Sequence, residues 1–143
     1  MQDSDTGVVT ELIKALYRED PAGKAMTDEK IRGTFDRLAA HPHAGTLLVF
    51  ETDSRTIGYA LLINFWSNEY GGNVLVIDEL YIVPAFRGQG MGTRFIQYLA
   101  ENRFNDCVAL ELEVLPYNAR ALKLYERIGF RKPDRDYLLL MAQ

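Results

Sequence analysis

The chain has 143 residues, 48% of them hydrophobic and 25% charged, and its 16 basic and 20 acidic residues give a formal net charge of −4. This length and composition are typical of one globular domain, residues 1–143, with a substantial core. No apolar run approaches the roughly 20 residues that span a bilayer, so we expect no membrane segment. The acidic balance argues against non-specific binding to nucleic acid.

Cysteine content and the N-terminus bear on the compartment. The single Cys107 excludes an internal disulfide and fits a reducing environment. Met1–Asp5 is acidic and polar, so we expect no signal peptide and a cytoplasmic protein. Because Cys107 precedes an apolar stretch, a buried structural thiol is favoured over a nucleophile.

The first predicted elements are two helices. Apolar residues recur at helical spacing from Val8 to Tyr17, with Asp5 or Thr6 available as N-cap. Thr27 can cap the second helix. Its apolar face consists of Ile31, Phe35 and Leu38.

A loop with two histidines, His41 and His43, follows the second helix. They could suggest a metal site, but no third ligand lies nearby in the sequence, and a surface turn is favoured. We therefore expect no metal.

Strands dominate the middle of the chain. Thr46–Glu51 and Thr56–Asn64 read as a hairpin, and Val74–Val83 as the next strand. The remaining predicted elements are a helix over Met91–Phe104, a strand over Val108–Val114, a helix over Asn118–Ile128 ending at Gly129, and a last strand over Tyr137–Met141. This order predicts a mixed α/β or α+β sheet flanked by helices.

A glycine-spaced turn, Arg87-Gly88-Gln89-Gly90-Met91-Gly92, joins the Val74–Val83 strand to the following helix. The first turn of a helix has unpaired N–H groups and the positive end of the helix dipole. Glycines let the backbone approach a phosphate closely, and Arg87 adds a charged fork. The turn therefore predicts a phosphate or diphosphate site, although a tight connection between strand and helix would need the same glycines.

The sequence of this turn does not match the motifs of two familiar phosphate-binding loops. The mononucleotide P-loop needs Lys-Ser/Thr after its second glycine, and no such string occurs. The dinucleotide fingerprint fits Gly88 and Gly90 but has Thr93 where its third glycine belongs. An unrelated nucleotide-binding module is disfavoured for this reason.

Two motifs together resemble the GNAT superfamily of N-acetyltransferases. The first is Ile77 to Pro84 followed by Arg87-Gly88-Gln89-Gly90-Met91-Gly92. The second is the segment Asn118–Phe130, which has an Asn, a short helix with a Tyr, and Gly-Phe. The resemblance is strong from Thr46 to the C-terminus. It implies a mostly antiparallel mixed sheet flanked by helices, in which the fourth and fifth strands splay apart.

The resemblance also implies acetyl-CoA as the cofactor and assigns residues to it. The backbone of the fourth strand receives the pantetheine arm, the glycine turn holds the diphosphate, and the second motif adds two side chains. These positions are Leu80, Tyr81, Ile82, Val83, Arg87, Gly88, Gln89, Gly90, Met91, Gly92, Thr93, Asn118 and Tyr125. Asn118 could equally be only the cap of its helix.

Acetyl transfer to an amine needs a proton donor for the departing thiolate, and the resemblance points to Tyr125. A phenol with a pKa of about 10 keeps its proton at neutral pH and can give it to a leaving sulfur. The alternative is that Tyr125 is a core aromatic, because Leu122, Tyr125 and Ile128 share helical spacing.

The same reaction needs an acceptor for the ammonium proton, because an alkylammonium near pKa ~10.4 is mostly charged at pH 7. Glu79 is the first candidate and Asp78 the second. Neighbouring strand residues normally face opposite ways, but the family carries a bulge in this strand that alters the alternation. Both residues could instead be solvated charges, or could orient a cationic substrate.

The function implied is transfer of an acetyl group from acetyl-CoA to a primary amine in a ternary complex. The acceptor is a small-molecule amine or a peptide amine. Glu69-Tyr70-Gly71-Gly72 ahead of Asp78 faintly resembles the diamine acetyltransferase branch. The alternative is a domain of the same fold that senses acyl-CoA without turnover.

Two further expectations concern the ends of the chain. Dimers are frequent in the family, and the segment Leu138–Leu140 is a candidate for sharing between subunits. Family members open with a strand, whereas this sequence starts almost at its first helix, so that strand is either short and irregular or absent from the sequence.

Overall fold

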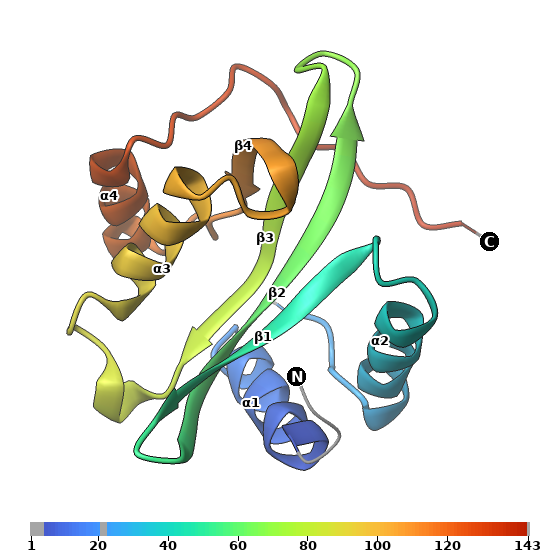
Figure 1. Cartoon of the computed structure of the whole chain (residues 1–143), viewed down its shortest axis with the longest axis vertical. Coiled ribbons are helices and arrows are strands. Elements are labelled where there is room, and N and C mark those ends of the chain that lie inside the picture. The colour runs from blue at the N-terminus through green and yellow to red at the C-terminus, as the bar shows by residue number, and fades with distance from the viewer. Residues whose placement is uncertain (1–4, 21–22, 143) are drawn as a thin grey trace. The chain divides into compact units, whose positions relative to one another are not determined.

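The chain forms two compact units, Met1–Glu113 and Val114–Gln143, in the computed structural model, which describes residues 5–20 and 23–142. The larger unit holds a sheet of strand order β1-β2-β3-β4 with helices on both faces (Figure 1). Its main elements are α1 (Thr6–Arg18), α2 (Asp28–Ala40), β1 (Gly45–Thr52), β2 (Arg55–Ser67), β3 (Gly72–Ile82), α3 (Met91–Glu101) and β4 (Cys107–Leu112). That all 143 residues form one domain stays a prediction.

Helices α1 and α2 cover one face of the sheet, as their apolar spacing predicts (Figure 1). The core on this face comprises Val9, Leu12, Ile13, Ile31, Leu47, Tyr59, Leu61 and Tyr81. The Thr27 side chain accepts a hydrogen bond from the Lys30 N–H at 3.3 Å, so the predicted cap of α2 is confirmed. Helix α1 begins at Thr6 with Asp5 as N-cap, without a side-chain capping bond.

Helix α3 lies against the opposite face (Figure 1). It buries Ile96 and Leu99, and its Phe95 ring meets Phe50 of β1 edge-on, with ring centroids 4.9 Å apart. Because β2 is covered on both faces, residues 57–62 are buried without alternation. The larger unit is therefore layered as helices, sheet and helix.

The sheet is mixed and mostly antiparallel, as the resemblance implies. Strand β2 pairs antiparallel with β1 and with β3, whereas β3 and β4 are parallel. Asp53 and Ser54 form the predicted turn of the first hairpin, and both have positive φ, 46° and 60°. Two-residue hairpin turns of this hand match the twist of the flanking strands.

Strands β3 and β4, which correspond to the family's fourth and fifth, stay paired along only part of their length. Their register runs from Asn73 opposite Cys107 to Ile77 opposite Leu112. Beyond Ile77, β3 continues to Ile82 with β2 as its partner. The expected divergence of these two strands thus begins at Asp78.

Some sequence-based boundaries and one predicted strand were wrong. Strand β2 runs on to Ser67 rather than ending at Asn64. Helix α3 ends at Glu101 rather than Phe104, because Arg103 and Asn105 adopt positive φ and turn the chain into the short 3₁₀ helix Phe104–Asp106. Strand β4 ends at Leu112 rather than Val114. Residues 137–141 form no strand, because an apolar run becomes one only when its backbone pairs with a neighbour.

The smaller unit contains helix α4 (Ala119–Ile128). The Asn118 side chain caps it, accepting from the Ala121 N–H at 3.1 Å. At its end Gly129 has φ 116°, and the Phe130 N–H donates to the Tyr125 carbonyl at 3.0 Å. The predicted start and stop of this helix are therefore confirmed.

Two expectations concern the N-terminus and the membrane. A short, irregular opening strand, one of the two alternatives for the N-terminus, would lie within residues 1–4, which are outside the described residues. No helix in the described part of the chain is long and apolar enough to cross a membrane.

Candidate active site

The glycine turn follows β3 and the short 3₁₀ helix Pro84–Phe86, and it leads directly into α3. Gly88 and Gly90 have φ of 76° and 75°, in the left-handed region that favours glycine. A Cβ placed at Gly88 would meet nothing within 4 Å. The glycine there is required by the backbone conformation and not by crowding.

The N-terminus of α3 carries no side-chain cap. Gly90 is its N-cap residue, and the helix starts with the Arg94 N–H donating to the Gly90 carbonyl at 3.0 Å. The N–H groups of Met91, Gly92 and Thr93 precede that first bond and have no partner within the helix. Unpaired amides at the N-terminus of a helix are groups that can bind an anion.

Arg94 holds the turn from the helix side. Its Nη1 donates to the Gln89 carbonyl at 3.0 Å. This bond directs the arginine along the turn and fixes the carbonyl between the two left-handed glycines.

Arg87 does not stand free at the mouth of the turn. Its Nε donates to the Ile82 carbonyl at 2.7 Å, and its Nη2 donates to Glu19 Oε1 at 2.8 Å. Its guanidinium carbon also lies 5.1 Å from the centre of the Tyr81 ring. Glu19 is the C-cap residue of α1. The Arg87 contacts therefore connect the start of the turn to the end of α1, which lies on the other face of the sheet from α3 (Figure 1).

The end of β3 provides the backbone edge assigned to the pantetheine arm. Leu80, Tyr81 and Ile82 pair with β2, and the N–H of the next residue, Val83, donates to the Ile57 carbonyl at 2.9 Å. Since β4 pairing stops at Ile77, the β4-facing edge of these residues takes no part in the sheet ladder. An extended ligand can pair with such an edge.

The acidic pair sits on a bulge, as the resemblance implies. Leu61 is opposite Glu79 and Leu62 is opposite Ile77, which leaves Asp78 as the extra residue. The bulge places Ile77 and Glu79 on different faces of the sheet, although residues two apart normally share a face. Glu79 is consequently directed toward α1, and Asp78 is exposed at the bulge.

Glu79 is the buried member of the pair, with 8% of its surface exposed. Tyr17 of α1 donates to its Oε1 at 2.7 Å, and Tyr59 of β2 donates to its Oε2 at 2.8 Å. Burial raises the pKa of Glu79, and the two phenol donors oppose that rise by favouring the charged form. Both phenols have raised pKa values, mainly because they are buried.

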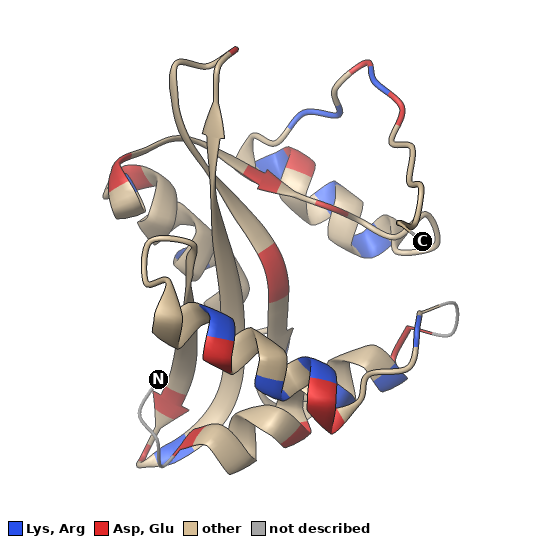
Figure 2. Ribbon diagram, turned by 90° about the vertical axis from the view of Figure 1, so that its right-hand side faces the viewer, with Lys and Arg blue, Asp and Glu red and all other residues tan. Residues whose placement is uncertain are grey.

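Asp78 lies where β3 and β4 diverge. Partial removal from water raises its pKa, and the charge of Glu113, the residue after β4, adds to the rise. Figure 2 shows acidic residues in the middle of a strand of the sheet as well as on the helices. Asp78 is thus exposed at the surface, whereas both carboxylate oxygens of Glu79 accept hydrogen bonds from tyrosines.

The second motif lies in the smaller unit, where its residues also have structural roles. Asn118 caps α4. The Tyr125 ring packs edge-on against Phe130 at 5.8 Å, within the hydrogen-bonded stop of the helix. Burial raises the pKa of Tyr125, so its phenol is protonated at neutral pH, as a proton donor requires.

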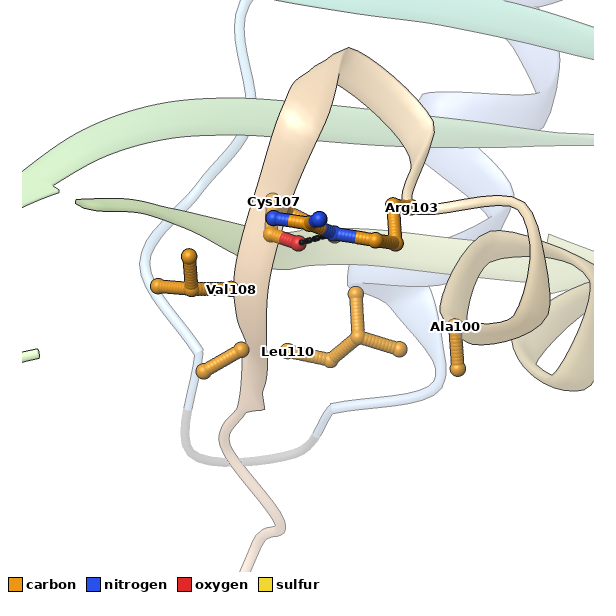
Figure 3. Close-up of a pocket in the computed structure, with 6 residues that line it drawn as sticks. Ala100, Arg103, Cys107, Val108 and Leu110 are labelled. Carbon is orange, nitrogen blue, oxygen red and sulfur yellow. Dashed lines mark hydrogen bonds between the residues drawn. The ribbon is translucent and has the colours of Figure 1, made fainter.

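A cavity of about 410 Å³ lies elsewhere in the larger unit, between the end of α3 and β4 (Figure 3). Its lining residues are Ala100, Arg103, Cys107, Val108, Ala109 and Leu110. None of the predicted site residues lines it. Cys107 is buried there, as predicted, and burial raises the pKa of its thiol, which disfavours the nucleophilic thiolate.

No three His, Cys, Asp or Glu side chains among residues 5–20 and 23–142 gather as metal ligands.

The sequence model of the acetyltransferase (GNAT) family matches residues 9–130. The chain belongs to this family. GNAT proteins are acyltransferases that use acetyl-CoA, and one solved structure similar to this GNAT chain is an aminoglycoside N-acetyltransferase in complex with CoA. That structure has a TM-score of 0.78 and 18% identity, covering 100% of this chain and 92% of its own.

Other relatives of this GNAT chain are matched over shorter stretches. The thialysine N-epsilon-acetyltransferase of Mus musculus is 38% identical over 77 residues, 53% of this chain and 45% of that protein. The aminoglycoside N(6')-acetyltransferase type 1 of Klebsiella pneumoniae is 33% identical, over 48% of this chain and 35% of its own length. The matches span less than half of these relatives.

A second solved structure covers nearly the whole GNAT chain, at a higher identity than the aminoglycoside N-acetyltransferase structure. It is an integron cassette protein from the mobile metagenome of Cole Harbour Salt Marsh, with a TM-score of 0.80 and 26% identity. It covers 98% of this chain and 86% of its own.

The roles of Tyr59 and Glu19 were missed from the sequence. Tyr17, Tyr59 and Glu79 are widely separated along the chain and meet only in the folded sheet. No spacing rule connects them. The partial signal was the position of Tyr17 at the end of an amphipathic helix.

Proposed function

We propose that this GNAT chain transfers an acetyl group from acetyl-CoA to a primary amine by direct attack in a ternary complex. The observation that carries the proposal is the uncapped N-terminus of α3, preceded by two left-handed glycines and by a β3 edge released from β4. Together they supply amides for a diphosphate and a strand edge for an extended arm.

The residues of the turn and of β3 hold the cofactor. The amides of Gly88 to Thr93 bind the diphosphate, and the backbone of Leu80 to Val83 receives the arm. One N–H on that edge polarises the thioester carbonyl, as an oxyanion donor does. Asn118, at the start of α4, contacts the cofactor.

Three proton transfers accompany the reaction. A carboxylate of the bulge, Glu79 or Asp78, takes one proton of the ammonium directly or through water. The amine nitrogen then bonds to the acetyl carbon, the C–S bond breaks, and Tyr125 gives its phenol proton to the departing sulfur. The second proton that the nitrogen loses as the amide forms passes through water to the Tyr125 phenolate.

The acceptor is a small cationic amine, polyamine-like in character, or a lysine or N-terminal amine of a peptide. The relatives in mouse and Klebsiella are named for acetylating thialysine and aminoglycosides, which are amine compounds, and this supports the small-molecule class. Carboxylates at Asp78 and Glu79 suit a cation.

We also propose a cytoplasmic homodimer, with the exposed Leu138 and Leu140 between subunits.

Acetyl-CoA binding and thiol release test the function. The chain should bind coenzyme A in calorimetry and release free thiol when given acetyl-CoA and an acceptor from a panel of diamines, lysine analogues, aminoglycosides and peptides. Binding without thiol release for any acceptor would favour the sensor alternative. Absence of binding would contradict both.

A substitution at Gly90 locates the binding. Gly90→Val should weaken coenzyme A binding by at least about tenfold, because a β-branched residue is strained at φ 75° and the backbone of the turn must shift to accommodate it. Gly33→Val is the matched control, since a Cβ at that exposed position of α2 meets nothing within 4 Å. Equal affinity in the two variants would show that the turn only connects β3 to α3.

A further inference from the structure

The contact between Glu19 and Arg87 joins two segments that are 68 positions apart in the sequence. Glu19 Oε1 accepts from Arg87 Nη2 at 2.8 Å and from the Tyr81 hydroxyl at 3.3 Å. The guanidinium lies over the Tyr81 ring, so one carboxylate oxygen binds both the cation and the aromatic beneath it.

Glu19 is itself held in place. Its backbone N–H donates to the Leu16 carbonyl at 3.1 Å as the last turn of α1 closes. Helix α1 is fixed in the core through Val9, Leu12 and Ile13. Two residues before Glu19, Tyr17 bonds Glu79 of β3, so the end of α1 contacts β3 at two successive points.

The turn on the other side of Arg87 needs such an anchor. Gly88 and Gly90 give the backbone more freedom than other residues do, and a Cβ at Gly88 would meet no neighbour. Arg94 fixes the exit of the turn through Gln89, and Arg87 fixes its entry through Ile82 and Glu19. Without Glu19, the Arg87 fork loses its charged partner.

Electrostatics alone predicts the opposite role for Glu19. A carboxylate beside an anion site repels the ligand, and removing it should strengthen binding. An exposed ion pair by itself also adds little stability, and here the Arg87 and Glu19 side chains are 42% and 46% exposed. A benefit from Glu19 would therefore have to come through the orientation of Arg87 and of the turn.

We propose that Glu19 is a positioning residue for the cofactor turn: it holds Arg87 across the end of β3, so that the turn amides are arranged before coenzyme A arrives. The inference rests on the proposed function only for the identity of the ligand. Arg87 then acts as a clamp between α1, β3 and the turn, in addition to its positive charge.

The sign of the affinity change tests this inference. Glu19→Gln should weaken coenzyme A binding about fivefold in calorimetry, although it removes a negative charge. Glu51→Gln is the matched control, because it removes an equal charge from exposed Glu51 of β1, which is not among the groups the structure shows on Arg87. It should leave affinity unchanged or slightly increase it. Equal or tighter binding by Glu19→Gln would overturn the inference.

A double-mutant cycle separates positioning from independent effects. Arg87→Lys keeps the charge but loses the fork that spans Ile82 and Glu19. If Glu19 acts through Arg87, the double variant binds coenzyme A no more weakly than Arg87→Lys alone. Multiplication of the two single fold-changes would contradict the inference. In turnover, Glu19→Gln should raise the KM for acetyl-CoA and leave the KM for the amine unchanged.

Hydrogen exchange without ligand gives a readout that does not depend on the proposed function. The amides of Phe86, Arg87 and Arg94 flank the turn and donate to the carbonyls of Val83, Pro84 and Gly90. They should exchange several-fold faster in Glu19→Gln than in the unmodified chain or in Glu51→Gln. Unchanged exchange would overturn the positioning role. If the unmodified chain does not bind coenzyme A, the proposed function fails, and the exchange measurement still decides whether Glu19 orders the turn.

Discussion

The two adjacent carboxylates of β3 have different surroundings although they are neighbours in the chain. Glu79 is directed into the core on the α1 side, where two phenols occupy both of its oxygens. Asp78 is the extra residue of the bulge and is exposed. The environment of Glu79 is suited to orientation and proton sharing, and that of Asp78 to contact with a substrate.

The pH dependence of turnover can distinguish the two. A proton acceptor must be ionised, and the pKa values of both Asp78 and Glu79 are raised. The plot of kcat/KM against pH should therefore have a rising limb whose midpoint lies above the ordinary pKa range of a carboxylic acid. Replacing the acceptor, by Asp78→Asn or Glu79→Gln, should lower kcat/KM about 100-fold and abolish that limb.

Replacing the other carboxylate should leave the limb in place. Glu111→Gln, at an exposed position of the neighbouring strand β4, is the control for a general loss of negative charge. A limb that persists in both Asp78→Asn and Glu79→Gln would remove the pair from the acceptor role.

At the scale of elements, helix α1 is attached to β3 by side-chain hydrogen bonds as well as by apolar packing. Tyr17 makes the central contact, because its hydroxyl donates to Glu79 at 2.7 Å. A hydrogen bond to a charged group contributes roughly 1.5–3 kcal/mol. Tyr17→Phe should therefore lower the free energy of unfolding by about 2 kcal/mol in urea titrations at neutral pH.

The raised pKa of Tyr17 also predicts a pH effect. Above about pH 10 the unfolded chain releases its tyrosine protons, while the folded chain retains the one on Tyr17, since burial and Glu79 hold its pKa higher. The folded state then binds more protons, so stability falls as pH rises. Tyr17→Phe should reduce that slope, and Tyr98→Phe, at an exposed position of α3, should not. Equal slopes would contradict the contact.

The elements were predictable where local pattern and pairing agree. The amphipathic helices, the Asp53–Ser54 turn and the Gly129 stop follow from apolar spacing and from residues that suit each backbone conformation. The apolar run from Tyr137 to Met141 has strand composition but forms no ladder in the structure. Pairing depends on the rest of the sheet, which composition does not encode.

The candidate site was predictable only in part for a similar reason. The residues of the glycine turn are consecutive in the sequence, so its backbone conformation could be predicted from their types. The contacts of Glu79 with Tyr17 and Tyr59 depend on the register of β2 against β3 and on the bulge at Asp78. A bulge changes which face a residue occupies without a distinctive residue type. The position of Glu19 on Arg87 likewise follows from helix packing.

At the scale of the whole molecule, the family match over residues 9–130 includes parts of both compact units. The cofactor turn and the acidic pair belong to the larger unit, and Asn118 and Tyr125 to the smaller. The proposed reaction therefore assigns its proton acceptor and its proton donor to different units. A functional test of Tyr125 is also a test that both units serve one reaction.

Tyr125→Phe should lower turnover at least about tenfold and leave acetyl-CoA affinity nearly unchanged, because it removes an acid and keeps the ring that packs on Phe130. Retention of that packing should keep the melting temperature close to that of the unmodified chain. Tyr137→Phe is the matched control in the same unit, since its side chain is 75% exposed, and it should leave turnover unchanged. If Tyr125→Phe turns over at the normal rate, the phenol is only a packing group of α4, and the thiolate takes its proton from water or from a residue of the larger unit.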